Sequence, residues 1–291
     1  MFARVVEKWL PRIVVMPLFA VSLFFVYGFI AWTTWISFTR SGVMPDYGFA
    51  GLQQYERLWS TPRWYVALGN LAVFSILFIG FCIVVGILLA ILLDQRIRIE
   101  GAIRTIYLYP MALSFIVTGT AWKWILNPGL GLEHLAHQWG WTDFHFGWLV
   151  DPRMAIYTVV IAGVWQSSGY VMALFLAGLR SVDDEVLRAA AIDGAGPIRT
   201  YTSIILPMIR PVFFSAIIVL AHLAIKSYDL VVALTGGGPG YATDVPATFM
   251  YSFAFQRSEL GTAAASAVMM LVTILAIIVP YLYSELREAG R

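Results

Sequence analysis

Charged side chains are scarce in this sequence, and that scarcity excludes several classes of protein. Asp, Glu, Lys and Arg make up 12% of the 291 residues and apolar residues make up 60%, whereas soluble domains carry roughly 25% charged residues. The net charge of +2 is too small for a surface that binds a nucleic-acid backbone. A soluble globular enzyme, a disordered protein and a nucleic-acid partner are therefore excluded. The composition predicts an integral membrane protein surrounded by lipid.

Two kinds of functional motif are also missing. Cys82 is the only cysteine and lies in an apolar run, so no internal disulfide can form and a cysteine-based site would lack partners. No G-x-x-x-x-G-K-[ST] phosphate loop occurs, and the glycine-rich run 235–240 lacks the lysine. The chain is therefore expected to bind no cofactor, and any ATP and magnesium that it depends on must sit on another subunit.

Long charge-free runs predict an all-α fold with six membrane-spanning helices. A helix needs about 20 residues to cross about 30 Å of hydrocarbon. The first run follows three basic residues, as a signal peptide would, but it is far longer than an apolar signal region and is expected to be a retained anchor. The third run is short, and the fifth is expected to continue past Lys226. The six spans, assigned to one transmembrane domain (1–291), are 13–39, 64–93, 105–122, 154–179, 211–234 and 260–284.

The distribution of Lys and Arg predicts the orientation of these spans. Cytoplasmic segments carry an excess of basic residues. If the N-terminus is cytoplasmic, the inner segments hold twelve Lys and Arg residues, while the outer segments, longer in total, hold seven. Both termini are therefore expected in the cytoplasm.

The segment 180–210, cytoplasmic in this orientation, has the pattern of a short helix that ends in a glycine turn. Ser181 followed by Asp184 is a helix-start signature, and acidic residues in the first turn suit the positive end of the helix dipole. Gly194 stands where the left-handed residue that ends the helix is expected.

Three prolines predict a second helix after that turn. Pro197 suits a first helical position, where its missing N–H costs nothing. Pro207 and Pro211 are expected to close this helix and to open the fifth span. A capped helix pair of this kind is either an amphipathic loop on the membrane or a knob that inserts into a partner's cleft.

The run 189–196, AAAIDGAG, followed by Leu206 and Pro207, closely resembles the EAA loop of permease subunits of binding-protein-dependent ABC importers. Segments 49–75, 234–243 and 260–268 are similar to parts of the carbohydrate branch, so the resemblance covers most of the chain. The nearest likeness is to maltose-type sugar permeases, including glucose/mannose importers of pseudomonads. The residues that this resemblance implies in coupling to an ATPase are Glu185, Arg188, Ala189, Ala190, Asp193, Gly194, Ala195, Pro197, Tyr201, Leu206 and Pro207.

One position departs from the family pattern. Arg188 stands where the motif has a glutamate that contacts a basic residue of the ATPase. Glu185 lies one turn earlier on the same helical face and could take over this contact.

The resemblance implies a type I ABC importer fold in a bacterial inner membrane, with a cytoplasmic coupling helix. The expected partners are a second homologous permease subunit, an ATPase dimer and a periplasmic sugar-binding protein. Transport would follow alternating access, and the chain would not be an enzyme.

Polar side chains in the fourth span are candidates for the sugar pathway. Gln166 and Tyr170 share a helical face; by the resemblance, Ser167, Tyr170 and, on the fifth span, Ser227 match sugar-contact positions of the maltose-type subunit. The alternative is that these groups are interhelical hydrogen bonds worth about 0.6 kcal/mol each. Trp165, nearby, is expected to pack rather than to stack on sugar.

Other polar residues receive a structural interpretation. Lys226 and Asp229 are expected to form an ion pair at the cavity rim, with direct ligand contact as the alternative, and His222 is expected to be buried with an interhelical hydrogen bond. Histidines and acids in the outer segment 123–153 could bind a metal, although solvation is the preferred interpretation and no metal site is assigned: Glu133, His134, His137, Asp143 and His145.

Two other classes of function compete with an ABC permease. An ion-coupled secondary transporter usually shows internal repeats and midplane carboxylates, and neither is evident in the firm spans. A membrane enzyme or assembly factor would need a catalytic cluster at one membrane face, and only the outer-segment group comes near to one.

Overall fold

The structure, a computed structural model, describes residues 2–95 and 97–289. These residues are helical apart from turns, loops and one bridge between Thr39 and Phe49, which agrees with the predicted all-α fold. η1 is a 3-10 helix, and η2 and η3 are π-helices. In chain order the elements are α1 (Phe2–Ile36), α2 (Gln53–Ser60), α3 (Pro62–Asp94), α4 (Glu100–Leu108), η1 (Tyr109–Ala112), α5 (Phe115–Ile125), α6 (Leu132–Gln138), α7 (Ala155–Leu179), α8 (Asp184–Ile192), α9 (Pro197–Thr200), η2 (Tyr201–Ile205), α10 (Leu206–Met208), α11 (Arg210–Ile225), α12 (Tyr228–Leu234), α13 (Pro246–Tyr251), η3 (Ser252–Gln256) and α14 (Leu260–Ala289).

The chain divides into two compact units, one made of residues up to 61 and 250–271, the other of 62–249 and 272–291. In the first unit, one buried amide joins α2 to its neighbours. Gln54 donates to the Thr39 carbonyl (2.8 Å) and accepts from the Thr262 hydroxyl at 2.9 Å. Because both ends of this amide are paired, its burial is compensated.

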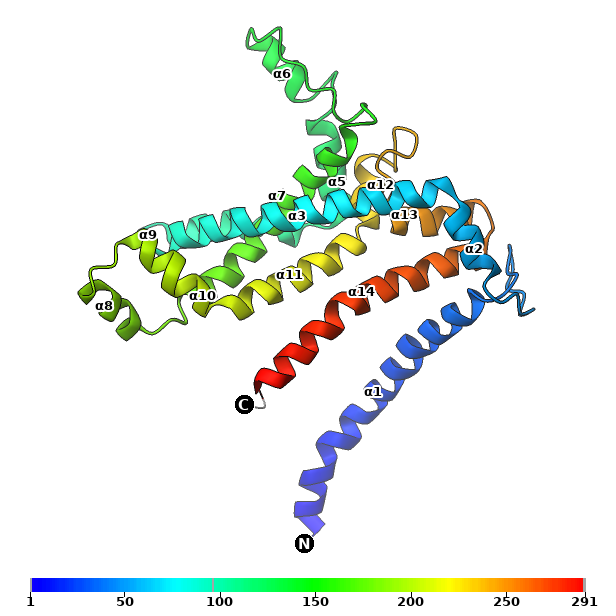
Figure 1. Ribbon diagram of the computed structural model, residues 1–291, viewed down its shortest axis with the longest axis horizontal. Helices are drawn as coiled ribbons and strands as arrows, with labels where there is room; N and C mark the ends of the chain where they lie inside the picture. Colours follow the sequence, from blue (N-terminus) through cyan, green and yellow to red (C-terminus); the bar gives the residue numbers. More distant parts are fainter. Residues whose placement is uncertain (1, 96, 290–291) are drawn as a thin grey trace. The chain divides into compact units, whose positions relative to one another are not determined.

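In the second unit, α3 packs against α7 and α11, and α11 also contacts α7 (Figure 1). Small residues make these contacts close: a Cβ on Gly86 of α3 would lie 2.6 Å from Val171 of α7, and one on Gly119 of α5 would lie 2.7 Å from Ala233 of α12. Close backbone approach is a usual source of association between helices in a membrane, where lipid is as apolar as the side chains.

Four of the six predicted spans are confirmed as long apolar helices. They are Val14–Ile36, Pro62–Asp94, Ala155–Leu179 and Leu260–Pro280. The other two are bent pairs, so the count reaches six only if each bent pair is one span.

The prediction of a continuous third span over 105–122 is wrong. Glu100–Ala112 and Phe115–Ile125 meet at an angle of 101°. Leu113 and Ser114 are extended between them, and the Ser114 hydroxyl accepts a hydrogen bond from the Val117 N–H at 3.3 Å. This side-chain cap starts a new helix, which is why the apolar run does not continue as one rod.

The fifth span is also interrupted. α11 ends at Ile225, with Lys226 as its C-cap, and the next helix, α12, begins at Tyr228. The predicted run 211–234 is therefore two helices separated by Lys226 and Ser227. The helix that precedes it, Pro197–Met208, is bent by 68° against Arg210–Ile225.

Candidate functional site

The segment between α7 and α11 folds as the predicted helix, turn and helix, and lies at one end of the second unit (Figure 1). Gly194 has a φ of +75°. The Ala195 N–H donates to the Ala190 carbonyl (2.9 Å) and the Gly194 N–H to the Ala191 carbonyl at 3.2 Å. These two bonds form a Schellman motif, which uses a left-handed residue to satisfy the last carbonyls of a helix. The predicted role of Gly194 in ending the helix is confirmed.

The start of α8 differs from the prediction. Asp183 is the N-cap, and its side chain accepts from the Glu185 N–H at 2.9 Å. Ser181 donates its hydroxyl to the Gly178 carbonyl of α7 instead (2.7 Å). An aspartate is as good a cap as serine and adds charge at the positive end of the helix, so the cap falls two residues later.

The second helix begins at Pro197 as predicted, after Gly196, but Pro207 does not close it. The chain runs from α9 through the π-turns of η2 into α10, which contains Pro207. The helix ends instead at Met208, with Ile209 as its C-cap. The Leu206 N–H bonds five residues back to Tyr201, and this wide turn accommodates a residue that has no N–H to offer.

The surface of this helix pair is open. Ile192 and Ile198, on either side of the glycine turn, are 86% and 81% exposed. Glu185 and Arg188 are also exposed, and in the described part of the chain neither takes part in an ion pair. Exposed branched apolar side chains beside a tight turn are what a surface covered by a partner presents.

Tyr201 connects the helix pair to the end of α3. Its hydroxyl donates to Asp94 at 3.0 Å and accepts from the Gln95 amide at 3.2 Å. Arg180, at the end of α7, binds Glu100 at 2.8 Å and approaches Asp94 at 3.9 Å. We name these five residues the Tyr201 network. Sequence reasoning identified only Tyr201 among these five residues. The charged residues at the ends of three apolar runs were a signal that could have pointed to the others.

Gln166, Ser167 and Tyr170 lie together at a cavity of about 280 Å³. Gln166 is buried and donates its amide to the Leu113 carbonyl at 2.8 Å, where the third span bends. The cavity also contains Ser114 and the exposed carboxylate of Asp229. This lining offers carboxylate, amide and hydroxyl groups to a polyhydroxylated ligand.

Three of the predictions around the fifth span need correction or restriction. Ser227 is buried but does not line this cavity. Lys226 and Asp229 are both exposed and form no ion pair among the residues that the structure describes, because the break after Ile225 interrupts the helical spacing that would pair them. His222 is exposed rather than buried.

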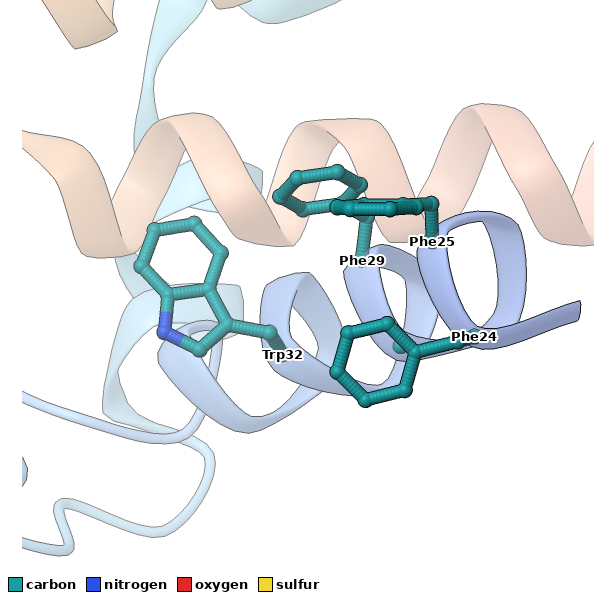
Figure 2. Close-up of a pocket in the computed structure, with 5 residues that line it drawn as sticks. Phe24, Phe25, Phe29 and Trp32 are labelled. Carbon is teal, nitrogen blue, oxygen red and sulfur yellow. The ribbon is translucent and has the colours of Figure 1, made fainter. Parts of the chain in front are cut away.

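Two other cavities are apolar. Trp165 packs edge-on against Trp122, with ring centroids 5.9 Å apart, and faces a cavity of about 510 Å³ lined by aliphatic and aromatic side chains and by Ser168. Figure 2 shows the second, of about 310 Å³ on α1, where Phe24, Phe25, Phe29 and Trp32 surround Gly28. Neither lining includes a carboxylate or an amide side chain, both of which line the cavity at Gln166.

Of the five candidate metal ligands between residues 133 and 145, three come together, and Asp143 is exposed and outside that cluster. Glu133, His137 and His145 come together, with their ligand atoms within 4.8 Å of one another, whereas His134 pairs with Gln138. The Phe146 N–H, and after it His145, donates to Glu133 and lowers the pKa of that carboxyl below its usual value.

Comparison with known proteins decides the family of this chain. Residues 82–288 match the family described as binding-protein-dependent transport system inner membrane component. The chain belongs to this family. It is therefore a multi-pass membrane protein with the importer permease fold, and an ion-coupled secondary transporter is not favoured.

Similarity to two permease proteins supports this membership. Over 261 residues, and 89% of each chain, the protein is 40% identical to the probable ABC transporter permease protein PH1215 of Pyrococcus horikoshii. It is 38% identical to the xylose/arabinose import permease protein XacH of Haloferax volcanii, over 91% of this chain and 84% of the relative. The fold is also similar to that of a bacterial ABC transporter involved in alginate import, with a TM-score of 0.83, 21% identity and 98% coverage of both chains.

Proposed function

We propose that this chain is the permease subunit of an ATP-driven sugar importer and forms half of its translocation pathway. The other half is a second homologous permease, with an ATPase dimer on the cytoplasmic side and a sugar-binding protein on the periplasmic side. Family membership and the sugar named for the Haloferax relative support this assignment. The chain itself hydrolyses nothing, since ATP and magnesium belong to the ATPase subunits.

The observation that carries the proposal is the exposed helix pair α8–α9. Ile192 and Ile198 offer an apolar tip that a cleft on the ATPase would cover. The distribution of Lys and Arg supports a cytoplasmic position for this tip and for both termini. The residues assigned to coupling remain Glu185, Arg188, Ala189, Ala190, Asp193, Gly194, Ala195, Pro197, Tyr201, Leu206 and Pro207.

Within this group, Glu185 is proposed to supply the acidic contact that the motif normally takes from position 188. Its backbone N–H is held by the Asp183 cap, while its carboxylate is exposed and free of ion pairs in the described residues. The Tyr201 network then passes movement of the helix pair to α3 and α7, because Tyr201 and Arg180 both approach Asp94.

The sugar pathway is proposed to include Gln166, Ser167 and Tyr170, and Asp229 joins them on the geometry of the cavity. Ser227 lies outside this cavity and is included on the resemblance to sugar-contact positions. A carboxylate can accept two sugar hydroxyls. Pentoses, hexoses and short oligosaccharides all fit this chemistry, and glucose or mannose stays one candidate among them.

The test compares two glycines that lie two residues apart. Gly194 requires a positive φ, whereas Gly196 has a φ of −70° and open space around its Cα. Gly194→Ala therefore costs about 1–2 kcal/mol in the turn, and Gly196→Ala leaves it intact. We expect Gly194→Ala to lower co-purification of the ATPase and sugar-stimulated ATP hydrolysis in proteoliposomes at least fivefold.

Gly196→Ala serves as the matched control and should behave as wild type. Equal ATPase recovery and equal sugar-stimulated hydrolysis in both variants would overturn the proposal that this turn is the docking element. Unchanged membrane insertion, measured by protein yield, separates a docking defect from a folding defect.

A further inference from the structure

Two neighbouring parts of the segment between α5 and α7 bring three metal-ligating side chains together. Glu133 and His137 are i and i+4 on α6, so they project from one helical face. His145 comes from the extended chain that follows. One ligand atom from each lies within 4.8 Å of the other two.

Backbone groups hold two of the three side chains in a set orientation. The His137 Nε2 lies 2.8 Å from the Phe144 carbonyl oxygen. Because a carbonyl only accepts hydrogen bonds, Nε2 carries the proton and Nδ1 keeps its lone pair for another partner. Glu133 Oε2 accepts from the Phe146 N–H at 3.0 Å, while Oε1 lies 3.2 Å from His145 Nδ1.

This arrangement reproduces the surroundings of a metal ligand. Histidines that bind a metal almost always donate their second ring N–H to a carbonyl or carboxylate, and ligating carboxylates are themselves hydrogen-bonded. Solvated histidines on a loop need no such support. Here both anchors, the Phe144 carbonyl and the Phe146 N–H, come from the same short segment that carries His145.

We propose that Glu133, His137 and His145 bind a Zn²⁺ ion. Two imidazoles and one carboxylate form a common protein donor set for zinc, with bonds of about 2.0–2.2 Å and a water in the fourth position. Ligands at these bond lengths lie roughly 3–4 Å apart, so small side-chain movements close the site. The ion replaces the contact between Glu133 and His145.

The expected role of the ion is to fix this segment. Zinc would join α6 to residues 144–146, where the rings of Phe146 and Trp148 already stack with centroids 4.8 Å apart. His145 is 74% exposed at its side chain, which gives the ion a direct path from solvent. The proposal does not depend on the sugar-importer assignment, because its residues lie outside the cavity and the helix pair.

The experiment measures Zn²⁺ bound to the full-length chain in detergent, purified with an affinity tag that contains no histidine. We expect one tightly bound Zn²⁺ per chain by equilibrium dialysis and elemental analysis. Co²⁺ bound in its place should give the intense visible bands of four-coordinate cobalt. His137→Ala and His145→Gln should each weaken Zn²⁺ binding at least tenfold.

His134→Ala is the matched control, because His134 lies on the same helix outside the cluster and pairs with Gln138 at 3.0 Å. It should bind Zn²⁺ as wild type does. His145→Gln changes an exposed side chain, so this variant should fold, which gel filtration would verify. Substoichiometric binding by the wild type, or equal losses in His134→Ala and His145→Gln, would overturn the proposal.

Discussion

Two membrane helices of this chain, α7 and α1, bury very different shares of their surface within their own units. The most apolar window of α7 has a mean hydropathy of 1.6 and is 67% buried, whereas that of α1 has a mean hydropathy of 2.3 and is 0% buried. The less apolar helix is therefore the one enclosed by protein. In a bilayer this order is expected, because lipid accommodates apolar side chains as well as a protein interior does.

What encloses α7 is close packing and polar pairing rather than hydrophobicity. Gly169 allows the Tyr107 carbonyl to approach, and Gln166 satisfies the Leu113 carbonyl. On α1, a Cβ on Gly28 would meet nothing within 4 Å. The middle of α7 therefore has close neighbours in its unit that depend on particular side chains, whereas Gly28 in the middle of α1 has none.

The largest difference between the two helices is expected at their glycines. Gly169→Ala places a Cβ against the backbone carbonyl of Tyr107, which cannot move as a side chain can, and should destabilise the chain by about 3 kcal/mol. Gly28→Ala should leave stability unchanged or slightly raised. Thermal unfolding in detergent checks both, and a Gly169→Ala variant as stable as wild type would contradict the packing described for α7.

A smaller difference is expected at their phenylalanines. Phe175 of α7 is fully buried and lies edge-on to Phe213, with ring centroids 4.6 Å apart. Phe175→Ala should cost about 2 kcal/mol, below the 3–5 kcal/mol of soluble cores, because transfer of the ring to lipid in the unfolded state costs little. Phe24→Ala, at a side chain 74% exposed, should cost nothing in the isolated chain. A loss that arises only in the assembled transporter would show that a partner subunit covers α1.

The smallest difference is expected at side chains that bond to a carbonyl. Gln166→Leu leaves the Leu113 carbonyl without its donor and should cost about 1 kcal/mol, near the upper range of polar contacts in membrane helices. Thr34→Val removes a bond of 2.7 Å to the Ile30 carbonyl on the exposed surface of α1, where the helix already satisfies that oxygen. Equal stabilities for the two variants in the same denaturation assay would show that the Gln166 hydrogen bond of α7 stabilises the chain no more than the Thr34 hydrogen bond of α1.

Much of the helix pair could be predicted because its determinants are local. Gly194 ends the first helix through its own positive φ, and Pro197 begins the second because a first helical position needs no N–H. Both roles hold however the helices pack. The N-cap at Asp183 could not be predicted because Ser181 fits the same sequence pattern. Only the hydrogen bond of the Ser181 hydroxyl to the Gly178 carbonyl shows that Ser181 is not the cap. Pro207 was misread because a π-turn ahead of it removes the need for its N–H.

The cavity was predicted in part. Gln166, Ser167 and Tyr170 are neighbours on one helix, so their grouping follows from helical spacing. Asp229 was assigned to a pair with Lys226 because i and i+3 meet on a continuous helix. The interruption after Ile225 separates that pair and leaves Asp229 at the cavity.

The sequence alone determined where apolar runs long enough to cross a bilayer lie and how the helix pair turns at Gly194, because both depend on residues close together in the chain. Only the tertiary structure decided the bends at Ser114 and Lys226, the Tyr201 network and the cluster of Glu133 with His137 and His145. Tyr201 and Asp94 are 107 residues apart, and the Leu113 carbonyl finds its donor 53 residues away. Contacts at such separations depend on how whole helices pack, which no local pattern of side chains specifies.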